Sequence, residues 1–220
     1  HPKMAPYIHS KRDGSHIIDL TKTAERLELA LDFLESTAAS GKQVLLVGTK
    51  RQAQEIIGKA AKDTEMPYVT ERWVGGMLTN SNTINGRIKH LKDLEIKMDS
   101  GALEAKYNKL ELQRFQEEID ELNFMYGGIK FMSNRPGAVF VVDIIKEANS
   151  VREARKLGIP VVAIVDSNTN PSPIDYPIPA NDDAIKTIQL ITDYVVSAIS
   201  AGKGKAAKKA TKTSDKKEEK

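Results

Sequence analysis

The segment Val47-Gly48-Thr49-Lys50-Arg51 places two cations where a short apolar run meets a predicted helix. In α/β folds this junction binds phosphate, because the free N–H groups and the dipole of the helix face an anion. The segment has one glycine and matches neither the G-x-G-x-x-G fingerprint nor the P-loop pattern. The pattern therefore argues against a bound nucleotide. A backbone phosphate of a nucleic acid is the better ligand for Lys50 and Arg51, and solvated surface charge is the alternative.

The segment Arg72-Trp73-Val74-Gly75-Gly76-Met77-Leu78-Thr79-Asn80 is the most unusual in the chain and contains its only tryptophan. A glycine pair permits a tight backbone path or the close approach of another chain. Thr79, Asn80 and Asn82 offer hydrogen-bonding side chains just before a long predicted helix. We expect Trp73 to lie mostly in the core and the loop as a whole to contact nucleic acid. The alternative is that the glycines form an ordinary turn.

Neither metal binding nor catalysis is indicated. The carboxylates and amides that could suggest a cation site are Asp166, Asn168, Asn170, Asp175, Asp182 and Asp183. Their spacing fits no calcium loop, and such runs are ordinary turn material. The four histidines show no metal-ligand pairing, and neither a Ser/His/Asp set nor a carboxylate pair stands out. We expect no metal, no cofactor and no catalytic site.

Short apolar runs alternate with helical patterns along most of the chain. Strands are expected at residues 16–20, 43–48, 67–70, 138–143, 160–166 and 175–178, and helices at 21–40, 50–62, 150–157 and about 182–199. Continuous apolar runs such as Gln43–Gly48 are typical of strands buried on both faces. The alternation predicts an α/β fold with a parallel sheet covered by helices on both faces. Thr21 is the expected N-cap of the first helix.

The pattern changes between residues 83 and 126. Apolar residues at helical spacing indicate two long helices, over 83–98 and 104–126, around a short turn. We expect an antiparallel coiled-coil hairpin (83–126) inserted into an α/β domain that comprises residues 1–82 and 127–200. Residues 201–220 are rich in lysine and poor in apolar residues, which predicts a disordered tail.

Charge is unevenly distributed over the 220 residues. Residues 1–92 contain 14 basic and 10 acidic side chains, residues 93–202 contain 11 and 17, and the tail from 203 contains eight lysines and three acids. A polyanion would therefore meet the N-terminal half and the tail. The chain has no cysteine, no apolar run of membrane-spanning length and no visible secretory leader. His1 in place of Met suggests a processed or trimmed N-terminus.

Several motifs together resemble the S-two family of the bacterial small ribosomal subunit. The resemblance is carried by Arg72–Asn80, by Pro136–Asp143 followed by Glu147, Glu153 and Gly158-Ile159-Pro160, and by Pro2-Lys3-Met4, Val47–Arg51 and Ile178–Ala184. It covers roughly residues 1–199 in order. The family has a Gly- and His-containing segment before the Pro-Lys-Met motif, which this chain lacks, and the Lys-rich tail is outside the family pattern.

The resemblance implies a flavodoxin-like three-layer domain with a coiled-coil hairpin. It also implies a cytoplasmic, ribosome-bound protein that binds 16S rRNA between head and body and contacts neighbouring small-subunit proteins, with the OB-fold protein S-one among the possible partners. The expected RNA-contacting residues are Lys3, Lys11, Arg12, Lys50, Arg51, Arg72, Asn80, Asn82, Arg87, Lys89 and Lys92.

Two other functions remain open on the sequence. One is a nucleotide- or sugar-phosphate-binding α/β enzyme with a helical arm. The other is a laminin-binding or adhesion role, similar to that attributed to distant eukaryotic relatives. The missing phosphate-loop glycines argue against the first, and the absence of cysteine and of a visible leader argues against the second.

Overall fold

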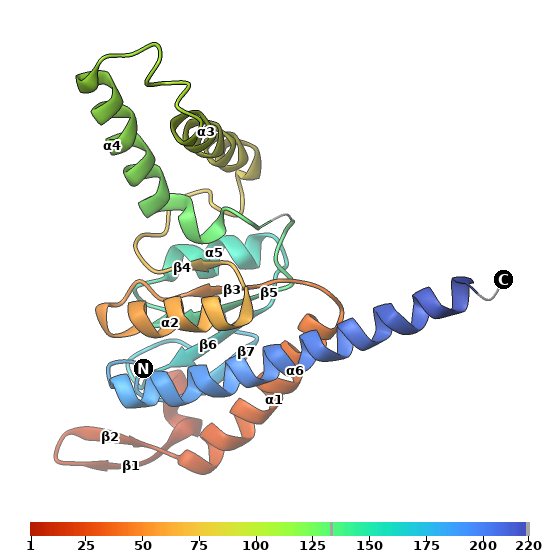
Figure 1. Cartoon of the computed structure of the whole chain (residues 1–220). Coiled ribbons are helices and arrows are strands. Elements are labelled where there is room, and N and C mark those ends of the chain that lie inside the picture. The colour runs from red at the N-terminus through yellow and green to blue at the C-terminus, as the bar shows by residue number, and fades with distance from the viewer. Residues whose placement is uncertain (133, 219–220) are drawn as a thin grey trace.

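The computed structural model describes residues 1–132 and 134–218, with side chains described as far as Lys208. Figure 1 shows a layered body from which two helices project at one end and a two-stranded hairpin at the other. The strands are β1 (Ile8–Arg12), β2 (Ser15–Ile18), β3 (Val44–Val47), β4 (Tyr68–Val69), β5 (Ala138–Val142), β6 (Val161–Val165) and β7 (Tyr176–Pro179). The helices are α1 (Leu20–Ala39), α2 (Arg51–Thr64), α3 (Ser81–Asp99), α4 (Lys109–Tyr126), α5 (Ala148–Lys156) and α6 (Ile185–Glu218), with short 3₁₀ turns at Pro2–Tyr7 and Gly127–Ile129.

The main sheet confirms the predicted α/β class. Its five strands are all parallel and lie in the order β4-β3-β5-β6-β7. Numbered from β3, this is the 2-1-3-4-5 order of flavodoxin-like folds. The order reverses between β3 and β5, and in such sheets a ligand binds at this switch point, beyond the carboxyl ends of the strands.

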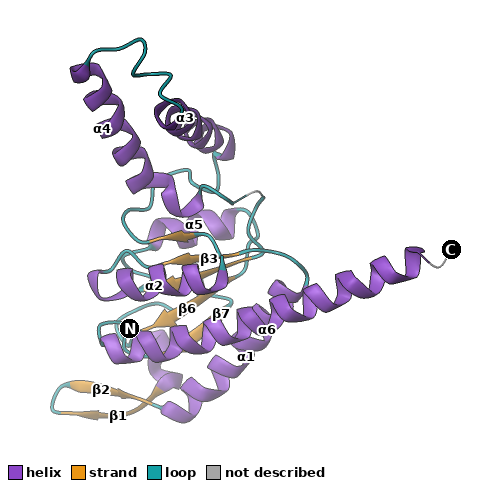
Figure 2. Cartoon of the chain, in the orientation of Figure 1, coloured by secondary structure: helices purple, strands orange, loops and turns teal. Residues whose placement is uncertain are grey.

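Alternate residues of the central strands enter two different cores. One core contains Leu45 and Val47 from β3, together with side chains from α5, α3 and α4. The other contains Val44 and Leu46, packed under α1, α2 and α6. All four of these β3 residues are 0% exposed. Figure 2 shows the resulting layers, with strands between two sets of helices. The continuous apolar runs are thus explained by burial on both faces.

The first predicted strand lies outside this sheet. β2 pairs with β1 as an antiparallel hairpin, and β1 was not predicted. The helix after β2 begins earlier than expected, because Asp19, and not Thr21, is its N-cap. The Asp19 carboxylate accepts a hydrogen bond of 2.9 Å from the backbone N–H of Thr21. Both residues are good capping types, so the sequence alone could not choose between them.

Both predicted helices are present, but the predicted antiparallel coiled coil is not confirmed. His90 lies 2.8 Å from Glu118, and Asn123 donates to Glu95 at 2.9 Å. From the first contact to the second, the residue number rises on both helices, from 90 to 95 on α3 and from 118 to 123 on α4. Along an antiparallel pair it would rise on one helix and fall on the other. Figure 1 shows α3 nearly end-on and α4 from the side, so the helices cross.

The apolar stripe of α3 packs against the body as well as against α4. Ile84, Ile88, Leu91 and Leu94 belong to the same buried cluster as Trp73 of the preceding loop. An apolar stripe of helical period specifies a buried face and not the partner that covers it. The spacing of apolar residues alone therefore does not distinguish a coiled-coil seam from a helix face that packs on the body.

We expect α3 to contribute to the stability of the whole domain. Leu91 is 0% exposed, and its replacement by alanine should cost about 2–5 kcal/mol of unfolding free energy in urea titrations. The control is Ile96→Ala on the same helix, because Ile96 is 65% exposed and should change stability by less than about 0.5 kcal/mol. Equal, small effects of both variants would show that the α3–α4 pair is independent of the core.

The last helix extends beyond residue 200, where the sequence predicted the start of disorder. At Gly202 a Cβ atom would lie 2.3 Å from the carbonyl oxygen of Glu35, so α6 passes directly against α1 there. Lys203 donates to the Thr64 carbonyl at 2.9 Å, and Lys205 forms an ion pair with Glu35. These contacts to α1 and α2 order residues that have few apolar side chains of their own.

Among the described residues, no helix combines the length and apolarity needed to cross a bilayer.

Candidate nucleic-acid interface

The switch point of the sheet is closed by contacts between the two loops that border it. The backbone N–H of Thr49, after β3, donates to the Glu147 carboxylate at 3.0 Å, and the Thr49 hydroxyl donates to the same oxygen. Lys146 donates to the Thr49 carbonyl at 2.8 Å. Glu147 is 1% exposed, and burial raises the pKa of its carboxyl group. The N–H group that would hold a ligand phosphate is therefore already bound by an acid of the protein.

Lys50 lies among carboxylates at the same edge. Its ammonium nitrogen is 2.6 Å from Asp183, 2.8 Å from Asp182 and 3.2 Å from Asp143. Burial alone would lower the pKa of Lys50, but the hydrogen bonds that its ammonium group donates to Asp182 and Asp183 raise it well above the ordinary value. The pKa of Asp182 is itself raised, by burial and by the nearby charges of Asp143 and Asp166. Three carboxylates thus lie around the Lys50 ammonium group.

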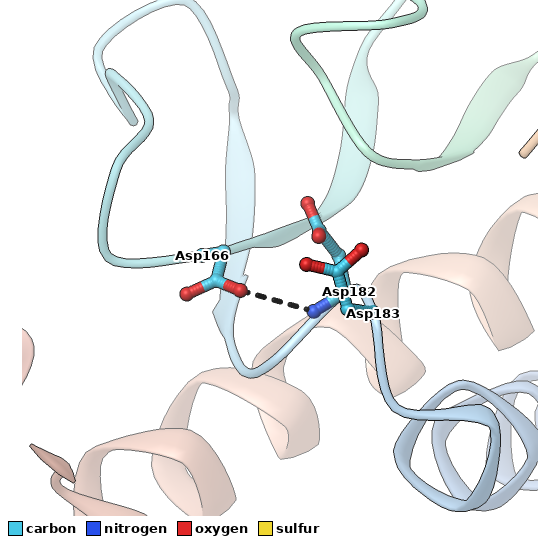
Figure 3. Close-up of side chains that lie close together, drawn as sticks. All are labelled: Asp166, Asp182 and Asp183. Atoms are coloured by element: carbon cyan, nitrogen blue, oxygen red, sulfur yellow. Dashed lines mark hydrogen bonds between the residues drawn. The ribbon is translucent and has the colours of Figure 1, made fainter. Parts of the chain in front are cut away.

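Asp166, Asp182 and Asp183 converge because they follow β6 and β7, whose carboxyl ends lie side by side (Figure 3). One carboxylate oxygen from each lies within 4.8 Å of the others. Asp166 also accepts hydrogen bonds from the backbone N–H groups of Ser167 and Asp182, as expected for turn residues. Lys50 already lies against two of the three acids. Their sequence positions indicate separate turns, and only the pairing of consecutive parallel strands brings them together.

This geometry argues against the phosphate-binding role expected for Lys50. Its side chain is only 13% exposed and its charge is paired, so it is not presented to an external phosphate. Arg51, at the first turn of α2, is exposed and remains a candidate. Gly48 has a packing role, because a Cβ atom there would lie 2.8 Å from Ile57 of α2. A mononucleotide phosphate would meet buried acids here, which argues against the alternative of a nucleotide-binding enzyme.

The tryptophan loop is held by one carboxylate of α5. Oε1 of Glu153 accepts hydrogen bonds from the Trp73 indole N–H (3.0 Å) and the Gly76 N–H (2.8 Å). Oε2 accepts from the N–H groups of Leu78 (3.0 Å) and Thr79 (3.1 Å), and from the Thr79 hydroxyl (3.1 Å). Burial would raise the pKa of Glu153, but these hydrogen bonds lower it below its usual value.

The loop also explains the second glycine of the pair. Gly76 has a φ of +85°, a conformation that other residues adopt at a cost. This conformation points the Gly76 N–H at Glu153. Trp73 is 8% exposed, which confirms that it is a core residue. The role of Glu153 was not predicted. The available signal was an acid at a helical position that faces the core.

The predicted RNA-contacting residues fall into separated groups. Lys3, Lys11 and Arg12 are exposed on the N-terminal segment and the β1–β2 hairpin, and Arg87 and Lys89 are exposed on α3, at the opposite end of the body (Figure 1). The remaining candidates near α3 are Arg72, Asn80 and Asn82, all exposed, and Lys92, which is half-buried with its ammonium 5.4 Å from the centre of the Phe131 ring. The groups therefore do not form one compact patch.

The fold and its sheet edge define a flavodoxin-like protein whose ligand position is occupied by its own side chains. A family model described as ribosomal protein S2 matches residues 1–202. The small ribosomal subunit protein uS2 of Coprothermobacter proteolyticus is 49% identical over 202 residues, covering 92% of this chain and 75% of that protein. The uS2 proteins of Bifidobacterium longum (49% over 201 residues; 91% and 72% covered) and Acidothermus cellulolyticus (46% over 211 residues; 96% and 77% covered) are also similar.

The chain belongs to the ribosomal protein S2 family. The match spans the α/β body, α3, α4 and the tryptophan loop, and it ends within α6 at residue 202. The resemblance carried by the sequence motifs is thereby confirmed.

Proposed function

We propose that this protein is a structural constituent of the small ribosomal subunit, which binds 16S rRNA between head and body and acts in the cytoplasm without catalytic turnover. The family match over residues 1–202 carries the proposal. Its relatives are named as small-subunit proteins and not as enzymes. The carboxylate-lined sheet edge supports the same conclusion, because it leaves the usual nucleotide position of the fold without a free phosphate site.

The separated basic groups support an extended contact with RNA. The β1–β2 hairpin presents Lys11 and Arg12 at one end of the body, and α3 presents Arg87 and Lys89 at the other. A surface of this kind can meet more than one RNA helix, consistent with a position between two parts of the subunit.

Neighbouring small-subunit proteins, with the OB-fold protein S-one among them, are the remaining proposed partners. The α/β body (1–82 and 127–200), the helical insert (83–126) and the tail (201–220) remain the proposed division of the chain.

The expected RNA contacts can be tested by filter binding over a salt series. Lys11→Ala with Arg12→Ala, and separately Arg87→Ala with Lys89→Ala, should weaken binding to 16S rRNA fragments. Each lost phosphate contact should lower the salt slope by about 0.9 for a duplex. Lys59→Ala with Lys62→Ala is the matched control, because both lysines are exposed on α2 away from the predicted contacts.

The same variants should be measured on an unrelated RNA duplex. A larger loss on 16S fragments than on this duplex supports specific contacts. Losses equal to those of the control pair would remove these four residues from the interface. Failure of the wild-type protein to prefer 16S fragments at all would contradict the proposed function.

A further inference from the structure

Helix α5 presents a basic outer face within a half of the chain that is acidic by composition. Residues 93–202 contain 11 basic and 17 acidic side chains. The two acids at the start and middle of α5 are turned inward, however: Glu147 is buried against Thr49, and Glu153 is bound by the tryptophan loop. Arg152, Arg155 and Lys156 are exposed. The surface charge of α5 is therefore positive.

A cavity of about 350 Å³ lies beside this face. Its lining residues are Ile144, Ile145, Ala148, Val151, Arg152, Arg155, Asn170 and Pro173. Ala148, Val151, Arg152 and Arg155 follow the i, i+3, i+4, i+7 spacing of one helix face. The cavity thus has an apolar wall with two guanidinium groups beside it, and its volume is within the range of about 300–1,000 Å³ typical of ligand pockets.

Polar groups at the cavity retain hydrogen-bonding capacity. The Asn170 side-chain oxygen accepts from the Ser172 N–H at 3.1 Å, which leaves the Asn170 amide nitrogen as a donor. Arg152 donates to the Asn149 side chain at 3.1 Å through one of its nitrogens. Within residues 1–132 and 134–208, neither Arg155 nor Lys156 has a carboxylate partner. Ile145, which lines the cavity, is 58% exposed.

We infer that this cavity receives an unpaired nucleotide of RNA, with the base against the apolar wall and the backbone phosphates on Arg152 and Arg155. Unpaired bases stack on the guanidinium planes of arginine, and arginine forks match phosphate oxygens. The Asn170 amide can donate to a base edge. The inference rests on the proposed RNA binding and adds a single-strand contact that the 16S filter-binding variants do not touch. An acidic peptide would satisfy the arginines but would not need the apolar wall.

The test uses the full chain and two fluorescein-labelled strands of about ten nucleotides. One is oligouridylate, and the other has the same backbone with its bases removed. Fluorescence anisotropy should show about tenfold weaker binding of the abasic strand by the wild type. Ile145→Asp should abolish this difference, and Arg152→Ala with Arg155→Ala should weaken binding of both strands. Lys59→Ala with Lys62→Ala is the charge-matched control. All substituted side chains are exposed, and circular dichroism checks the fold.

Equal wild-type affinity for the two strands would overturn the inference, as would a control pair that loses as much as the arginine pair. Displacement of oligouridylate by a decaglutamate peptide at equal concentration would assign the cavity to an acidic peptide and also overturn it. If the wild type prefers 16S fragments in filter binding while the α5 variants bind oligouridylate normally, only the cavity inference fails. If the wild type shows no such preference, the proposed function fails.

Discussion

Replacement of Glu153 with glutamine should destabilise the protein by about 2–4 kcal/mol and expose Trp73. The carboxylate accepts five hydrogen bonds, four of them from N–H groups of the tryptophan loop. An amide keeps one acceptor oxygen and turns an N–H₂ group toward donors, so N–H groups of the loop lose their partners. Urea denaturation followed by the fluorescence of the only tryptophan measures both effects.

The control is Glu121→Gln, because Glu121 is exposed on α4 and should change stability by less than about 0.5 kcal/mol. The pKa of Glu153 is lower in the folded protein than in the unfolded chain. Its stabilisation is therefore present at neutral pH and is lost as the pH falls through the folded-state pKa. The difference between wild type and variant should shrink in acid. A Glu153→Gln protein as stable as its control would show that the loop does not depend on this carboxylate.

Replacement of Lys50 with methionine should cost about 3–5 kcal/mol at neutral pH, because the Asp182 and Asp143 carboxylates would remain largely buried without their cation. Burial and neighbouring acids raise the pKa of Asp182, so protonation should relieve the repulsion as the pH is lowered. The stability loss should therefore be smaller at pH 5 than at pH 8. Thermal denaturation at both pH values measures it.

Lys59→Met is the matched control, since Lys59 is an exposed lysine on α2, the helix that begins beside Lys50. Combining Lys50→Met with Asp182→Asn should recover part of the lost stability, because the unpaired charge is removed together with its partner. Equal losses for Lys50→Met and Lys59→Met would contradict the description of Lys50 as an internal counter-ion. In that case Lys50 would again be a candidate for phosphate binding.

The sheet was predictable because each strand is a short apolar run between turn residues. Val44–Val47 and Ala138–Val142 are buried along their whole length, and this burial on both faces is what the runs indicated. Only β2 of the β1–β2 hairpin was predicted. β1 contains Ser10, Lys11 and Arg12 and has one half-buried and four exposed residues, so it lacks the alternation that marks a strand.

The candidate site was less predictable, because its contacts join residues far apart in the sequence. Lys50 was correctly located at a strand-to-helix junction, but its partners Asp143 and Asp182 are 93 and 132 positions away. Charge counts over each half also concealed the basic outer face of α5, since Glu147 and Glu153 of the acidic half are turned inward. Counting residues cannot separate charges that reach solvent from charges that are neutralised inside the protein.

The most direct test of the account is co-sedimentation with small ribosomal subunits that lack their own S2-family protein. We expect the chain to sediment with these particles at one copy each and to remain bound through moderate salt. Large subunits should retain none under the same conditions. If the chain stays at the top of the gradient, or binds small and large subunits equally and only at low salt, it is not a constituent of the small subunit.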